Sequence, residues 1–168
     1  MDKAANGVPE PQFKPEELYV SPFTGRRRFD EETGRRHYVP LERNVRPSGV
    51  RILDEYVQYV SADGFFSRRA FAESHGLTAA ELAVVCRALT GMSADELFHY
   101  LMLRLADDLL RYTSLPLSRV ATLCGANTQQ NLCVVMRKEY GCTPLERRYA
   151  LQCPGDEDLF CVEKAKDC

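Results

Sequence analysis

The sequence predicts an all-α body, in which two helix-turn-helix units are joined by a long linker helix, preceded by a small arginine-rich β-hairpin. Three observations predict this fold. Helix-capping patterns recur after residue 50, one long segment is apolar on nearly every side of a helical wheel, and the segments flanking it repeat each other. A chain of 168 residues with 45% hydrophobic residues is long enough for one ordinary domain with extensions.

The long linker helix is predicted over Ser93–Tyr112. Ser93 and Glu96 have the spacing of a capping box, which marks its start. Apolar residues crowd its wheel, and a narrow polar stripe runs along one face through Arg104, Asp107, Asp108 and Arg111. A helix that is apolar on nearly every side is buried on nearly every side. We therefore expect protein packed on it from both earlier and later parts of the chain.

Shorter helices are predicted on both sides of the linker. Thr78 with Glu81, and Thr143 with Glu146, have capping-box spacing, and glycines follow several helices where the left-handed conformation favours them. No strand pattern appears after Val60. The predicted helices begin with one between the break at Pro47-Ser48-Gly49 and Asp63-Gly64, and continue with Ser67–His75, Thr78–Thr90, Pro116–Cys124, Asn127–Tyr140 and Thr143–Tyr149.

Outside the body, residues 1–46 are predicted as an arm and residues 152–168 as a flexible tail, which leaves 47–151 as the domain. Residues 1–18, rich in proline and glutamate, are expected to be mobile. Two segments flanking the loop at 30–34 indicate a hairpin, Arg26–Phe29 and Arg35–Val39. Its arginines either contact phosphates or pair with Glu31, Glu32 and Glu42 on a solvated hairpin, and both interpretations stay open.

The segments on either side of the linker are two copies of one unit. When Leu82–Gly91 is placed over Leu132–Gly141, five of ten positions are identical. Upstream, with one extra residue in the second copy, Ala72 lies over Ala121 and Gly76 over Gly125. A small alanine lets two helices cross closely, and glycine supplies the positive φ of a tight turn. This is the helix-turn-helix arrangement, whose second helix can enter a DNA major groove.

Three segments resemble the AraC/XylS-type DNA-binding domain: Leu89–Leu110, Ser114–Gly125 and Met136–Tyr149. The last contains an aromatic-Gly-x-Thr-Pro-x-x-x-Arg pattern that closes domains of this family. The resemblance, from about Val50 to Tyr149, implies seven helices of homeodomain-like type, binding to two successive major-groove segments on one face of double-stranded DNA, and control of transcription. The linker, roughly 30 Å long, nearly matches the ~34 Å between such segments.

Candidate DNA-binding residues lie near the starts and outer faces of the unit helices, where groove contact needs hydrogen-bond donors. In the second unit they are Arg119, Thr128, Gln129, Gln130, Asn131, Arg137 and Lys138. In the first unit they are Arg68, Arg69, Thr78 and Arg87. The alternatives are that Asn127 caps its helix with Gln130 completing a capping box, and that the arginines are solvated surface residues.

The sequence departs from the family pattern on both recognition helices. Val84 and Val134 stand where the family commonly has arginine or another polar residue, and Ala126 replaces a phenylalanine after the second glycine. Cys86 and Met136 replace core phenylalanines. An alternative function follows, in which a degenerate domain keeps the fold and binds a protein partner through the two valines as an exposed apolar patch.

Composition and motifs exclude other classes. The net charge of −2 argues neither for nor against a polyanion partner. No apolar run reaches the ~20 residues of a membrane span, and the N-terminal residues lack the apolar region of a signal peptide, so we expect a cytoplasmic protein. The seven cysteines contain no Cys-x-x-Cys, which indicates reduced thiols without a metal or cofactor. His37, His75 and His99 belong to different elements, so we expect no enzyme. The 46 residues before the body are too few for a small-molecule inducer domain, which leaves abundance or a protein partner as the means of regulation.

Overall fold

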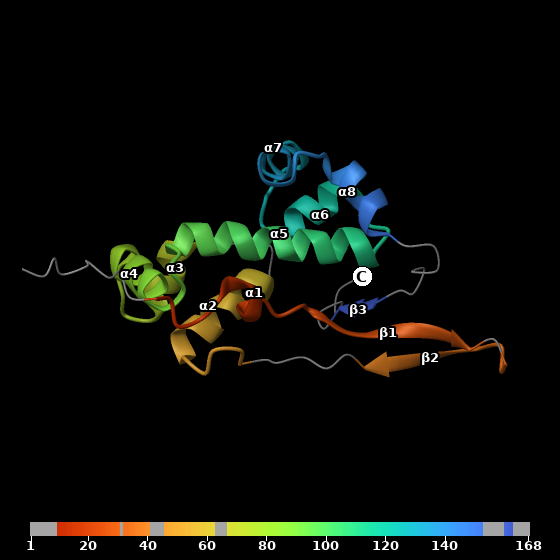
Figure 1. Cartoon of the computed structure of the whole chain (residues 1–168), viewed down its shortest axis with the longest axis horizontal. Coiled ribbons are helices and arrows are strands. Elements are labelled where there is room, and N and C mark those ends of the chain that lie inside the picture. The colour runs from red at the N-terminus through yellow and green to blue at the C-terminus, as the bar shows by residue number, and fades with distance from the viewer. Residues whose placement is uncertain (1–9, 31, 41–45, 63–66, 153–159, 163–168) are drawn as a thin grey trace, which may run out of the picture.

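A computed structural model describes residues 10–30, 32–40, 46–62, 67–152 and 160–162 (Figure 1). Seven helices form the body: α2 (Arg51–Ala62), α3 (Arg68–Ser74), α4 (Ala79–Thr90), α5 (Ala94–Tyr112), α6 (Leu117–Leu123), α7 (Gln129–Tyr140) and α8 (Pro144–Leu151). Before them lie α1 (Pro15–Leu18), β1 (Phe23–Asp30) and β2 (Arg35–Pro40), and after them β3 (Phe160–Val162). The predicted all-α body is confirmed.

Helix α5 is the element on which the others pack. Its predicted capping box is present, because the Glu96 carboxylate accepts the Ser93 N–H at 2.7 Å and the Ser93 hydroxyl accepts the Glu96 N–H at 3.3 Å. Figure 1 shows α3 and α4 at the N-terminal end of α5, and α6, α7 and α8 over its C-terminal half. The long helix therefore fixes one helix-turn-helix unit relative to the other.

The core consists of two clusters that succeed each other along α5. In the first, Leu82 and Cys86 of α4 are buried with residues of α2, α3 and the N-terminal half of α5. In the second, Leu132 and Met136 of α7 are buried with α6 and the C-terminal half of α5. The same two positions of the repeat are thus buried in each unit. Cys86 and Met136 fill the core positions where the family commonly has phenylalanine.

The turns of the two units confirm the repeat and locate its extra residue. Gly76 and Gly125 both have positive φ, +69° and +87°. In the first turn the Leu77 N–H donates to the Ala72 carbonyl, five residues back, whereas in the second the Asn127 N–H donates to Ala121, six residues back. The second turn is therefore one residue longer.

The N-cap of α7 differs from the prediction. Thr128 caps this helix, because its hydroxyl accepts the Asn131 N–H at 3.2 Å, as Thr78 caps α4. Asn127 lies one residue earlier with φ +67°, in the left-handed region that asparagine tolerates. The alternative in which Asn127 caps this helix and Gln130 completes a capping box is wrong, since the longer turn moves Asn127 out of the cap position.

The segment before β1 is packed on the body, which corrects the expectation that residues 1–18 are mobile, at least from residue 10 onward. The Phe13 N–H donates to the Leu89 carbonyl at 3.0 Å, and Leu18 is buried in the first core cluster. Tyr19 contacts both clusters, and its hydroxyl donates to Asp108 Oδ2 at 2.8 Å. The apolar residues spaced through this segment outweigh its proline and glutamate content. Residues 1–9 lie outside the described residues.

The predicted hairpin is confirmed, and it gains a third strand. Strands β1 and β2 pair antiparallel around the loop, with Arg28 opposite His37. Strand β3 pairs antiparallel with the other edge of β1, so the sheet order is β2-β1-β3. The expectations of no strand after Val60 and of a flexible tail are wrong for Phe160–Val162. A three-residue strand is stabilised by the partner it meets in the fold, and its own sequence signal is too short to predict it.

Candidate DNA-binding surface

Helices α4 and α7 present equivalent residues on their outer faces. Positions spaced by three and four residues lie on one face of a helix. On α4 the exposed residues at this spacing are Ala80, Val84, Arg87 and Ala88, and on α7 they are Gln130, Val134, Arg137 and Lys138. Each of these α4 residues lies fifty positions before its counterpart on α7, as the repeat requires. The two units therefore present one pattern, a branched apolar residue followed by an arginine, with different flanking residues.

The polar start of α7 contains both engaged and available groups. The Thr128 hydroxyl is occupied as the N-cap, and the Asn131 side-chain amide donates to the Ala126 carbonyl at 3.0 Å. Gln129 and Gln130 are exposed, and no hydrogen bond to another described residue holds their amides. Of the four predicted residues in this turn, the two glutamines can therefore turn toward a base edge without breaking an internal contact.

The candidate basic residues on α6 and α7 are exposed and unpaired within the described chain. Arg119 lies on α6, and Arg137 and Lys138 lie on the last turns of α7. None of the three forms an ion pair with a described residue. Their charges are therefore available to an anionic ligand.

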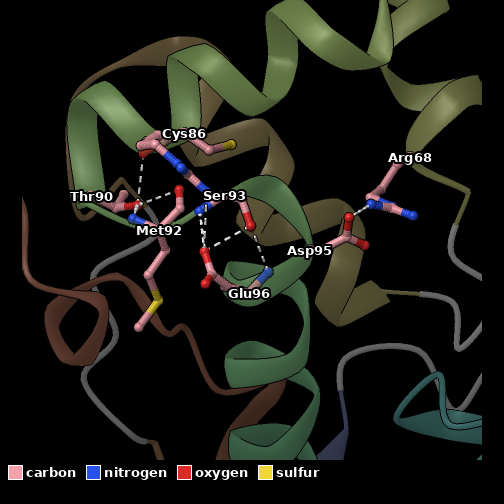
Figure 2. A network of polar contacts seen from close by, with 8 residues as sticks. Arg68, Cys86, Thr90, Met92, Ser93, Asp95 and Glu96 are labelled. Atoms are coloured by element: carbon pink, nitrogen blue, oxygen red, sulfur yellow. Dashed lines mark hydrogen bonds and ion pairs between the residues drawn. The ribbon is translucent and has the colours of Figure 1, made fainter.

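The arginines of the first unit are differently placed. Arg68 pairs with Asp95, and Arg87 lies 3.7 Å from Glu96, so both reach acidic residues in the first turn of α5. Figure 2 shows Arg68 turned toward Asp95 beside the Ser93–Glu96 capping box. Arg69 pairs within α3 with Glu73 at 2.7 Å. All three pairs are exposed, so each is weak, but each offsets part of the positive charge that this unit presents.

The start of α4 is closed by its own cap. The Glu81 carboxylate accepts the Thr78 N–H at 2.8 Å and the Thr78 hydroxyl at 2.9 Å. These hydrogen bonds lower the pKa of Glu81 and favour its charged form. The N–H and hydroxyl donors of Thr78 are therefore both engaged by one oxygen of Glu81 at this end of the helix.

The segment that contains the family pattern also holds α8 against α5, through Arg147, which lies one residue before the arginine of the pattern, Arg148. Gly141 ends α7 in the left-handed conformation, and Thr143 caps α8 with Glu146. Arg147 then donates to both carboxylate oxygens of Asp107, at 2.9 Å from Nε and 2.6 Å from the second nitrogen. This pair connects the last helix of the second unit to the linker. The sequence indicated Asp107 as part of a polar stripe and provided no sign of its partner.

The arginine-rich hairpin is described through its backbone and through only part of its side chains. The side chains of residues 26–30 and 36–39, and all of residues 41–45, lie outside the described residues, so the predicted contact with phosphates stays a prediction. Arg35 at the start of β2 is exposed. Figure 1 shows the hairpin and α7 on opposite sides of α5 in this view.

The cysteines and histidines form no reactive centre in the described chain. Cys86, Cys124, Cys133 and Cys142 are free, and burial raises the pKa of Cys86 and of Cys124 to about 11, so these two thiols stay protonated near neutral pH. The described residues contain no group of three metal-ligating side chains. In the same part of the chain, no helix has the length and apolar character needed to cross a membrane.

His75 at the end of α3 contacts a carboxylate from α2. Its Nε2 donates to Glu55 Oε2 at 2.6 Å, and its ring stacks on Phe71 with centroids 4.2 Å apart. The hydrogen bond to Glu55, followed by that to the Phe71 carbonyl, raises the pKa of His75 above its ordinary value of 6.5. The contact joins the leading helix of the first unit to α2.

This contact predicts a pH dependence of stability. Because the pKa of His75 is raised in the folded state, its contribution is complete below about pH 6.5 and is lost as the pH rises through the higher folded value. Denaturant unfolding between about pH 6 and pH 8 should therefore show a decline in stability, and the Glu55→Gln variant should flatten it. An NMR titration of His75 supplies the direct check. A pKa unchanged by the Glu55→Gln substitution would contradict this account.

Comparison with known proteins agrees with this geometry. Residues 68–149 match the family model of a helix-turn-helix domain. The C-terminal domain of AraT, a response regulator from Geobacillus stearothermophilus, superposes with a TM-score of 0.55 at 22% identity, over 61% of this chain and 88% of that one. A structure of the xylose-binding transcription activator XylR matches with a TM-score of 0.48 at 20% identity, over 60% of this chain and 26% of that one. No curated protein matches the sequence. Residues 68–149 therefore form a helix-turn-helix domain, in agreement with the resemblance to the AraC/XylS type.

Proposed function

We propose that this chain is a transcriptional regulator that binds double-stranded DNA through two successive major-groove segments, with most of the contacts made by the second unit. The observation that carries the proposal is the equivalence of the outer faces of α4 and α7, whose inner faces pack on successive halves of the one helix α5. Helix α5 has 19 residues, which corresponds to about 28 Å. This length is comparable to the ~34 Å turn of B-form DNA.

The electrostatics support an unequal division between the units. A basic residue that neutralises a phosphate releases condensed counterions, and this release supplies much of the affinity of a DNA-binding protein. Arg119, Arg137 and Lys138 of the second unit can do so without first giving up an internal ion pair. Arg68 and Arg87 of the first unit must exchange Asp95 and Glu96 for phosphate, so each contributes less.

The amides of the second unit support base recognition. Glutamine can form two hydrogen bonds with the N6 and N7 edge of adenine. Gln129 and Gln130 lie in the first turn of α7, the part of a recognition helix that meets base edges. At the equivalent positions of the first unit, Ala79 and Ala80 have no side-chain donor. We infer that hydrogen-bonded base recognition belongs to the second unit.

Salt-dependent binding tests the proposed function. The full chain should bind a pool of random duplexes at low salt, and the logarithm of its affinity should fall linearly with the logarithm of the salt concentration. Selection from the same pool should then yield a site with two recognised segments. If the chain binds no duplex even at low salt, the proposed function is wrong, and a protein-binding domain becomes the account to test.

Basic residues of the two units should differ in their effect on the salt dependence. The Arg137→Ala, Lys138→Ala double variant should reduce the salt slope by about two and weaken binding to all sequences, since each lost phosphate contact reduces the slope by about one. Arg87→Ala should reduce it by less than one, because this arginine already has Glu96 nearby. Arg51→Ala on α2 is the control for loss of an exposed arginine. Equal effects of Arg87→Ala and Arg137→Ala would contradict the unequal division.

A further inference from the structure

Two valines are exposed at the same position of the two recognition helices. Val84 and Val134 are each the sixth residue of their helix, and their exposed fractions are 68% and 65%. The only other large hydrophobic residues exposed in the described chain are Leu145 and Tyr149, both on α8. Because valine is a weaker helix former than alanine and neither residue belongs to a core cluster, the fold does not explain their presence.

The neighbours of the valines indicate what ligand could cover them. Val134 lies between Gln130 and Lys138, each four residues away on the same face, with Arg137 beside it. An apolar side chain surrounded by an amide and two cations is complementary to a ligand surface on which small apolar groups lie next to negative charges. Val84 has the smaller residues Ala80 and Ala88 at these positions, which leave its methyl groups open to close approach.

The DNA major groove has one apolar feature on its base edges, the C5-methyl group of thymine. Phosphates line both sides of the groove, within reach of a basic residue on the same helix. A valine followed three residues later by an arginine is therefore complementary to a thymine methyl group with a phosphate beside it. It occurs twice, as expected if both units meet the groove in the same orientation.

We infer that Val84 and Val134 each contact a thymine methyl group, so that the chain selects thymine at two positions about one helical turn apart. This inference rests on the proposed function and names the bases that its two units recognise. In the first unit the valine is the main determinant of specificity, since Ala79 and Ala80 donate no hydrogen bond and Glu81 is engaged by Thr78. In the second unit it acts beside Gln130, which suits an adenine close to the thymine.

Replacing thymine by deoxyuridine tests the inference, because it removes the methyl group and leaves base pairing intact. In the duplex selected for the full chain, each thymine is replaced in turn and the dissociation constant is measured. One replacement in each recognised segment should weaken binding about fourfold, the equivalent of one buried methyl group. The remaining replacements should have little effect.

Variants assign each methyl group to its valine. The Val134→Ala variant should bind the thymine duplex more weakly than the unaltered chain does. It should bind the thymine duplex and the corresponding deoxyuridine duplex with the same affinity, so that the effects of the substitution and of the lost methyl group are not additive. Val84→Ala should do the same at the other segment. Both substitutions are at exposed helical positions and should leave the fold intact. Leu145→Ala, an exposed aliphatic residue outside the recognition helices, is the matched control and should retain the full thymine preference.

The outcomes separate this inference from the proposed function. Tight binding to the selected duplex that is unaffected by every deoxyuridine replacement would overturn the inference and leave the proposed function standing. So would a thymine preference that survives in both valine variants. Absence of binding to any duplex would overturn both.

Discussion

Replacing Phe23 with alanine is expected to lower the free energy of unfolding by about 3–4 kcal/mol, the usual cost of removing a fully buried phenylalanine. Phe23 begins β1, is fully buried, and belongs to the core cluster of the second unit. Its ring meets Tyr112 edge to face, with centroids 5.6 Å apart. The arm would thereby be shown to complete the core, although the sequence places it before the domain.

Denaturant unfolding of the full chain measures this effect. Glu17→Ala is the control in the same segment, because Glu17 is exposed and its loss should change stability by no more than about 0.5 kcal/mol. Leu18→Ala should also destabilise the chain, by about 2–3 kcal/mol, through the first core cluster. If Phe23→Ala and Glu17→Ala had equal effects, the arm would not be part of the core.

Replacing Asp107 with alanine is the second change with a large expected effect, about 2–3 kcal/mol. Asp107 is nearly buried on α5 and accepts two hydrogen bonds from Arg147 of α8. Removing one partner of a buried pair leaves the other charge without compensation, at a cost of roughly 3–5 kcal/mol. The expected cost lies at or below the bottom of this range because the Arg147 side chain remains 28% exposed and water can partly solvate it.

The Asp107 variant should also loosen the second unit. Helix α8 contacts both α5 and α7, so weakening its attachment should increase hydrogen exchange in α8 before the rest of the body. Arg51→Ala, which breaks an exposed ion pair with Glu55, is the matched control and should change stability by less than about 1 kcal/mol. Equal destabilisation by the two variants would mean that the buried pair has no special role.

Much of the helical body could be predicted because its signals are local. A capping box requires two residues three apart, and a left-handed turn requires a glycine or an asparagine. The box at Ser93 and Glu96 and the turns at Gly76 and Gly125 could therefore be identified from the sequence. The repeat also predicted that the two units have the same fold, since aligned residues of two similar units occupy equivalent positions in each.

The candidate DNA-binding surface was less predictable, because whether a side chain is available to bind DNA depends on neighbours that are distant in the sequence. Arg68 and Arg137 look alike in the sequence, yet Arg68 lies against Asp95 while Arg137 is unpaired within the described chain. Asn127 was one candidate for the cap of α7, and the longer second turn gave this role to Thr128. The roles of these side chains follow from the packing of α3 on α5 and from the length of one turn.

By itself the sequence determined the helices, their order and the two-unit architecture, because caps, turns and apolar periodicity act within a few residues. Only the tertiary structure decided what covers the polar stripe of α5. Asp107 meets Arg147 from one side and Asp108 meets Tyr19 from another, across separations of 40 and 89 residues. Such contacts form only when the whole chain has folded, since a buried charge is stable only where a distant partner satisfies it. The linker helix therefore appears in the sequence, and the attachment of both the arm and the second unit to it appears only in the fold.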